Sequence, residues 1–230
     1  MGFTVISHVL CISKYFVDMQ DDDQLQSLRE IRNIMDRSTR FQSLSGLSGI
    51  VVGLVALAGA GAVQWYLSVQ GMQYAELSRS NLSFTTALYL GVVATVVLML
   101  AAGAAMYFTI LKAQKNRQPV WNTQARRLLA NICLPLAVGG VFCGALLYHS
   151  LGYLVAPATL LFYGLALING SKYTFVDLHS LGVGEVFLGL VSCFLIDYGL
   201  LAWTIGFGLL HIVYGTMMYY KYDSKERGEA

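Results

Sequence analysis

The chain has 230 residues, of which 56% are hydrophobic and 12% are charged. An ordinary soluble domain carries about 25% charged residues, so the composition argues against a typical water-soluble protein. The net charge of +2 argues against nucleic-acid binding, which needs a marked excess of positive charge. The length suits one bundle of helices and leaves no room for a second domain of usual size.

Long apolar runs separated by short polar segments predict an all-α, polytopic transmembrane helix bundle. The runs that are candidate spans lie at 44–67, 84–111, 128–148, 153–168, 178–196 and 198–219. The fourth run is short and contains Pro157. It is predicted either to be a membrane-crossing helix that begins before residue 153 or to be re-entrant. The chain is thus divided into an N-terminal segment at 1–41, a bundle at 42–220 and a charged tail at 221–230.

The N-terminal segment contains a predicted amphipathic helix at about 22–40. Its apolar residues recur at the spacing of one helix face, and they are Leu25, Leu28, Ile31 and Met35. Its candidate contacts to headgroups or to a partner are Arg29, Arg32, Arg37 and Arg40. Two interpretations stay open: the helix rests on anionic lipid headgroups, or it binds a protein partner or a second copy of the chain.

Lysine and arginine residues are concentrated on one side of the six-span arrangement. The loop after the second predicted span contains Lys112, Lys115, Arg117, Arg126 and Arg127, whereas the loop after the first has only Arg79. Because short cytoplasmic loops carry an excess of Lys and Arg, the sequence predicts that both termini are cytoplasmic.

Small residues mark two predicted helix contacts. Gly49 and Gly53 form a G-x-x-x-G step in the first span, and Gly140 and Gly144 form another in the third. Such steps let helix backbones approach closely in lipid, so both pairs are predicted to pack against neighbouring helices.

Glu185 is the most informative residue, because a charged group inside a span is costly and usually faces protein or water. Small and polar residues share its helix face, and they are Gly182, Gly189 and Ser192. The face of His211 in the sixth span has the same character, with Thr204, Gly208 and Gly215. The candidate intramembrane polar site is therefore Glu185, His211, Ser192 and Thr204.

A simple count places Glu185 and His211 at similar depth. Glu185 lies 12 residues before Asp197, where the last two spans turn, and His211 lies 14 residues after it. At a rise of about 1.5 Å per residue, the mismatch is about 3 Å. The pair is a plausible proton relay or ion site, and the alternative is that both side chains only hold the bundle together.

No catalytic residue, metal site or cofactor is predicted. The histidines are scattered one per element without the spacing that metal ligands need, and haem is disfavoured because His179 is offset from His211 by about 6 Å. An enzyme acting on lipid or quinone would need a polar cluster at headgroup depth, such as Asp177 and His179 near the mouth of the fifth span.

Residues 29–49 resemble the opening of an uncharacterised family of small bacterial polytopic membrane proteins. The resemblance is carried by Arg29-Glu30-Ile31-Arg32, Met35-Asp36-Arg37-Ser38-Thr39-Arg40-Phe41 and Ser43-Leu44-Ser45-Gly46-Leu47-Ser48-Gly49. It implies a bacterial inner membrane and no particular activity.

Three functions remain as hypotheses. The first is a non-enzymatic accessory, sensory or scaffolding bundle that engages a partner, or itself, through residues 22–40. The second is a proton-coupled small-solute transporter or channel that uses Glu185 and His211. The third is a membrane enzyme that acts on lipid or quinone.

Overall fold

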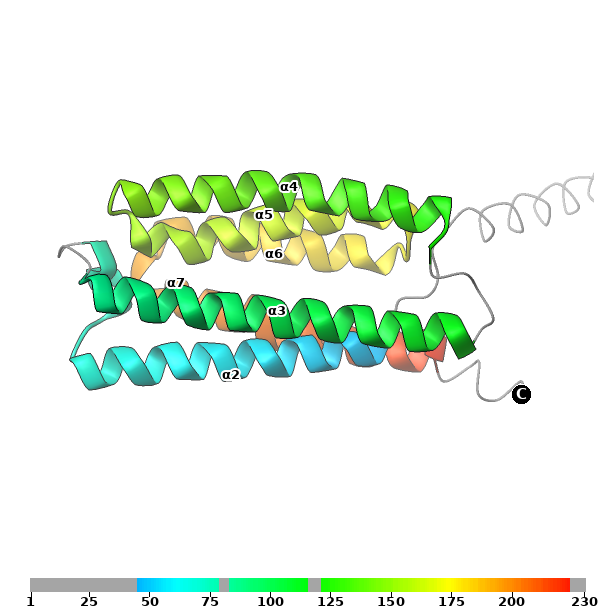
Figure 1. The fold of residues 1–230 in the computed structure, drawn as a ribbon, viewed down its shortest axis with the longest axis horizontal. Helices are drawn as coiled ribbons and strands as arrows, with labels where there is room; N and C mark the ends of the chain where they lie inside the picture. The colour runs from blue at the N-terminus through cyan, green and yellow to red at the C-terminus, as the bar shows by residue number, and fades with distance from the viewer. Residues whose placement is uncertain (1–44, 79–82, 116–120, 224–230) are drawn as a thin grey trace, which may run out of the picture. The chain divides into compact units, whose positions relative to one another are not determined.

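The structure, a computed structural model, describes residues 45–78, 83–115 and 121–223, all in the unit Phe41–Ala230. Every regular element in these ranges is a helix (Figure 1). Among them, six helical stretches are long and apolar enough to cross a membrane. The prediction of an all-α, multi-pass membrane bundle is confirmed. The amphipathic segment with its four arginines, and residues 224–230 of the tail, lie outside the described residues.

The first three spans are single long helices: α2 (Gly46–Gln70), α3 (Phe84–Lys115) and α4 (Thr123–Tyr148). Helix α2 stops because Gly71 has φ +64°, a left-handed conformation that glycine adopts without strain. Helix α4 starts before the predicted position 128, since the Asn122 side chain accepts a hydrogen bond of 2.7 Å from the backbone N–H of Ala125. This cap lets the helix continue beyond its apolar run.

The fourth predicted span is long enough to cross a membrane, although its apolar run is short. Helix α5 (Val155–Gly170) is extended by 3₁₀ turns at Gly152–Leu154 and Ser171–Tyr173. Together they give 22 residues, which matches the roughly 20 needed for a membrane. Pro157 lies in the first turn of α5, where no intrahelical N–H donor is required. A continuous helical stretch of this length favours the crossing alternative over the re-entrant one.

The last two spans form the expected hairpin, but they differ in regularity. Helix α6 (Asp177–Phe194) is a plain α-helix. The sixth span, Ile196–Tyr222, changes its helix type several times. Its parts are a 3₁₀ turn η4 (Ile196–Tyr198), α7 (Gly199–Trp203), a π-helical segment η5 (Thr204–Leu210), α8 (His211–Met218) and a π-helical end η6 (Tyr219–Asp223).

The spans pack as two groups that the sixth span joins. Helices α4, α5 and α6 contact one another in that order, and α3 packs on α2 (Figure 1). The sixth span contacts α2 along η5 and α8, and it contacts α5 and α6 through α7 and η5. Residues of α6 and η5 that face each other are therefore at the junction of the two groups.

The two G-x-x-x-G steps behave differently. A β-carbon on Gly49 would lie 3.0 Å from Cα of Gly215, and one on Gly53 would lie 2.7 Å from the carbonyl oxygen of Gly208. The predicted packing is confirmed for this pair. For Gly140 and Gly144 the prediction is wrong within the described residues, because a β-carbon there would meet nothing within 4 Å. The side of α4 that meets α5 is one position away, where Gly139 lies against Phe162.

Candidate functional site

Three helices bring Glu185, His211 and Tyr163 together at the junction of the two groups. Glu185 lies on the buried face of α6 with Gly182, Gly189 and Ser192, which is the stripe that the sequence indicates. His211 opens α8, and Tyr163 lies on α5. Glu185 is 0% exposed and His211 is 4% exposed, whereas Tyr163 is only partly buried.

The three side chains form a short polar chain centred on the imidazole ring. Nδ1 of His211 lies 3.4 Å from Oε1 of Glu185 and 3.0 Å from the carbonyl oxygen of Gly206. Nε2 lies 2.8 Å from the hydroxyl oxygen of Tyr163. The expectation that Glu185 and His211 share one depth agrees with these distances.

The Gly206 carbonyl identifies the proton position on the ring. A carbonyl oxygen only accepts hydrogen bonds, so Nδ1 of His211 must carry a hydrogen to form the 3.0 Å contact. In the neutral ring Nε2 is then the acceptor, and the Tyr163 hydroxyl donates to it. Tyr163 thus fixes the ring at one nitrogen while the other faces the carboxyl group.

The carboxyl group of Glu185 has no hydrogen-bond partner among the described residues. Both Oε1 and Oε2 are buried and unsatisfied, and the 3.4 Å approach to Nδ1 is too long and poorly directed to count as a hydrogen bond. An ionised carboxylate without a hydrogen bond is very unfavourable in an apolar interior. This closed arrangement therefore favours the neutral, protonated carboxyl group.

Gly206 makes the space that the carboxyl group occupies. A β-carbon on Gly206 would collide with Oε2 of Glu185, and it would lie 2.6 Å from a methyl carbon of Leu160. Gly206 therefore contributes twice, because its carbonyl binds the imidazole and its missing side chain admits the carboxyl group.

The π-helical register of η5 supports this geometry. Gly206 belongs to η5, and His211 follows directly after the segment. In a π-helix the hydrogen-bonding partner is five residues away, and the side chain of His211 binds the carbonyl five residues before it. Single π-helical turns inside α-helices are rare and are frequently found at functional sites.

Ser192 and Thr204 do not join the cluster. The hydroxyl of Ser192 donates to the carbonyl of Gly189 at 3.1 Å, and that of Thr204 donates to Leu200 at 2.7 Å. Each is satisfied within its own helix, as hydroxyl groups in apolar helices commonly are. The predicted quartet is thus corrected to Glu185 and His211, with Tyr163 and Gly206 as members that sequence spacing did not identify.

At the basic end of the spans, Asp177 ties α6 to the end of the sixth span. Nζ of Lys221 lies 2.8 Å from Oδ2 of Asp177, and the Tyr222 hydroxyl donates to the same oxygen at 2.7 Å. Asp177 is therefore engaged in joining two helices, and no interaction between Asp177 and His179 is present in the described chain. The predicted enzyme-like cluster is not assembled.

At the opposite end, Tyr74 connects the loop after α2 to the start of α5. Its hydroxyl donates to the carbonyl of Tyr153 at 3.1 Å and accepts from the backbone N–H of Ala156 at 3.3 Å. Burial raises the pKa of Tyr74 well above its usual value, so the hydroxyl keeps its proton. Helices α5 and α6 are thus joined to the rest of the bundle near both ends, through Tyr74 at one end and Asp177 at the other, as well as through Glu185.

Within the described ranges, no three His, Cys, Asp or Glu side chains converge in a way that would hold a metal ion. Comparison of the chain with protein-family models, with curated proteins and with solved structures finds no match. Functional reasoning consequently rests on the geometry of the polar cluster.

Proposed function

We propose that the protein is a proton-coupled transporter or channel for a small solute, with Glu185 as the group that binds and releases the proton. The observation that carries this proposal is a fully buried carboxyl group without a hydrogen-bond partner, 3.4 Å from an imidazole nitrogen. Ionisable residues inside membrane spans commonly mark proton and ion pathways. A merely structural carboxyl group would be expected to have its hydrogen bonds satisfied.

Proton transfer through His211 becomes possible once Oε1 of Glu185 moves from 3.4 Å into hydrogen-bonding distance of Nδ1. When Glu185 is ionised, a proton that arrives at Nε2 is matched by the Nδ1 proton moving to the carboxylate. The imidazole gains one proton and loses another, so its charge is unchanged after the step. Tyr163 is the donor placed at Nε2, so its hydroxyl is the group next in line on that side of the ring.

The position of Glu185 between helix groups supports coupling to a conformational change. A neutral carboxyl group is tolerated in the closed junction, whereas an ionised one needs water or a charge-assisted hydrogen bond. Loss of the proton therefore favours a separation or shift of α6 relative to the sixth span. Rocking of one helix group against another around a midplane site is a common transport mechanism.

A line of polar groups supports proton access from the basic end. Tyr214 lies about one turn beyond His211 on α8, and its buried hydroxyl has no hydrogen-bond partner among the described residues. Beyond Tyr214 lie Tyr222, Asp177 and Lys221. This order runs from Glu185 toward the end of the span that the positive-inside rule assigns to the cytoplasm.

The bacterial inner membrane is part of the proposal. Its support is the resemblance of residues 29–49 to the family of bacterial polytopic proteins, together with the concentration of Lys and Arg on one side of the spans.

Proton movement in proteoliposomes tests the function. The vesicles would contain a trapped pH-sensitive dye, and a potassium diffusion potential would be applied across their membrane. Mixtures of amino acids, of sugars, of organic acids and of nucleosides would then be added outside in separate assays. We expect at least one of these solute pools to drive acidification of the lumen. Glu185→Gln keeps the side-chain shape but removes the titrating group, so the rate should fall by a factor of about 100 or more, as for other positioned proton-transfer groups.

Glu76→Gln is the matched control, because it makes the same chemical change at an exposed residue outside the spans. Its rate should equal that of the unchanged protein. Equal rates for Glu185→Gln and Glu76→Gln, or no acidification with any pool, would reject proton-coupled transport.

A further inference from the structure

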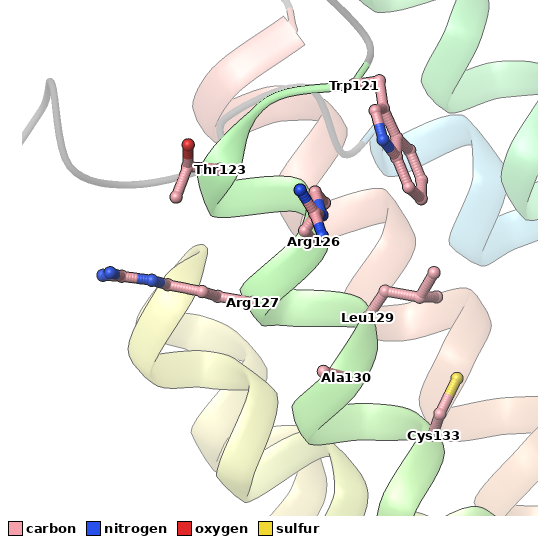
Figure 2. Close-up of a pocket in the computed structure, with 7 residues that line it drawn as sticks. All are labelled: Trp121, Thr123, Arg126, Arg127, Leu129, Ala130 and Cys133. Atoms are coloured by element: carbon pink, nitrogen blue, oxygen red, sulfur yellow. The ribbon is translucent and has the colours of Figure 1, made fainter.

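A surface depression at the start of α4 has the composition of a lipid-headgroup site. Its volume is about 520 Å³, and its seven lining residues are Trp121, Thr123, Arg126, Arg127, Leu129, Ala130 and Cys133 (Figure 2). None of these residues carries a carboxylate. The depression lies away from the Glu185 cluster, and transport does not require it.

Charged and apolar residues are arranged along one side of the helix. One face of α4 is formed by residues three, four and seven positions after Arg126. These residues are Leu129, Ala130 and Cys133. Figure 2 shows Trp121 beside Arg126, with Leu129 and Cys133 farther along the same side of α4, whereas Arg127 extends from the other side. The site is therefore basic at the helix end and apolar toward the middle.

The depth of these residues fits a phospholipid. A helix of 26 residues is about 39 Å long, and the hydrocarbon core of a bilayer is about 30 Å thick. The first turn of α4, which holds Arg126, therefore lies at headgroup level. Cys133 lies about 10 Å beyond Arg126 along the helix, within the acyl-chain region, and Leu129 between them is 48% exposed.

The arginines are available for a ligand. Both Arg126 and Arg127 are exposed, and neither guanidinium group forms an ion pair with a described residue. Arginine binds phosphate groups in a bidentate manner. Trp121, which is 67% exposed, is of the residue type that gathers at the membrane interface.

We propose that this depression binds an anionic phospholipid, with the phosphate on Arg126 beside Trp121 and an acyl chain along Leu129, Ala130 and Cys133. A free phosphate ion would use Arg126 but not the apolar residues, and a zwitterionic lipid would lack the net charge that the basic helix end attracts. Basic depressions of this kind on the cytoplasmic side of membrane proteins suit anionic headgroups.

Native mass spectrometry of the full chain tests the proposal. The protein would be given equal amounts of phosphatidylglycerol and phosphatidylcholine, and the bound lipids counted. We expect preferential retention of phosphatidylglycerol, reduced roughly fivefold by Arg126→Gln, because a basic residue at the headgroup contributes about that factor. Arg127→Gln should have a smaller effect, since this side chain extends from the other side of α4. Lys172→Gln removes an exposed cation from the turn that packs on the opposite face of α4, where Gly170 lies against Ile132, and should leave the preference unchanged.

Fluorescence quenching places the bound lipid. With Trp65→Phe and Trp203→Phe, Trp121 is the remaining tryptophan, and phosphatidylglycerol brominated on its acyl chains should quench it more than brominated phosphatidylcholine does. Arg126→Gln should remove the difference. Equal quenching by both lipids before that substitution, an equal effect of Lys172→Gln, or loss of the preference on addition of millimolar inorganic phosphate would overturn the proposal.

Discussion

At the residue scale, burial of the Glu185 carboxyl group without a hydrogen-bond partner is energetically unfavourable. Burying a carboxyl group without hydrogen bonds costs several kcal/mol less when it is neutral than when it is charged, and the closed junction offers no partner for a charge. A leucine of similar volume would pack there at no such cost. Packing alone therefore does not explain a carboxyl group at this position.

Gly206 provides a stability test of this arrangement. Gly206→Ala would push its β-carbon into Oε2 of Glu185 and toward Leu160, and overpacking of this kind typically costs about 1–3 kcal/mol. We expect a lower unfolding temperature in detergent. Adding Glu185→Ala should recover part of the loss, since contacting residues are not additive.

Gly103→Ala in α3 is the control, because a β-carbon there would meet nothing within 4 Å. It should be neutral or slightly stabilising, as alanine favours a helix over glycine. If Gly206→Ala were tolerated as well as Gly103→Ala, the carboxyl group of Glu185 would not lie against residue 206.

At the element scale, the sixth span differs from all the others in its helix geometry. Its π-helical segment η5 (Thr204–Leu210) contacts α2 on one side and α6 on the other. Turns of π-helix inside α-helices are rare and are frequently found at functional sites. Under the proposed function, the sixth span is the element expected to shift when Glu185 changes its protonation.

The N-terminal segment bears on the first functional hypothesis, which stays a prediction. All elements of the described bundle belong to the unit Phe41–Ala230, so a chain lacking residues 1–40 should insert and unfold at an unchanged temperature. If residues 22–40 mediate self-association, light scattering in detergent should give a dimer mass for the full chain and a monomer mass for the shortened one. Equal masses together with an unchanged cellular phenotype would count against an accessory or scaffolding role through this segment.

At the scale of the whole molecule, the orientation of the spans determines on which side of the membrane the proposed proton path opens and the proposed lipid site lies. The distribution of Lys and Arg predicts that both termini are cytoplasmic. A green fluorescent protein fused after residue 230 should therefore fluoresce in bacterial cells, and alkaline phosphatase inserted after residue 80 should be active. The opposite pair of results would place Arg126 and the proposed lipid site on the outer side.

Composition and periodicity were sufficient to predict the membrane bundle, its six spans and the Glu185–His211 pair. The pair could be predicted because both residues lie on one helical hairpin, where the number of residues from the turn gives the depth in the membrane. The packing of Gly49 and Gly53 could also be predicted from the sequence, because small residues four positions apart in a membrane helix commonly mark a close contact with another helix.

The tertiary structure alone decided the rest. Tyr163 joins the site from α5, which lies outside the hairpin of the last two spans, so counting residues from the turn does not give its position. Hydropathy does not distinguish it from other tyrosines in the spans. The roles of Gly206 and η5 depend on a helix register that composition does not encode. Ser192 and Thr204 share the right faces but satisfy their hydroxyl groups locally. Sequence periodicity determines which side chains share a face, whereas only the packing of helices determines which of those side chains meet.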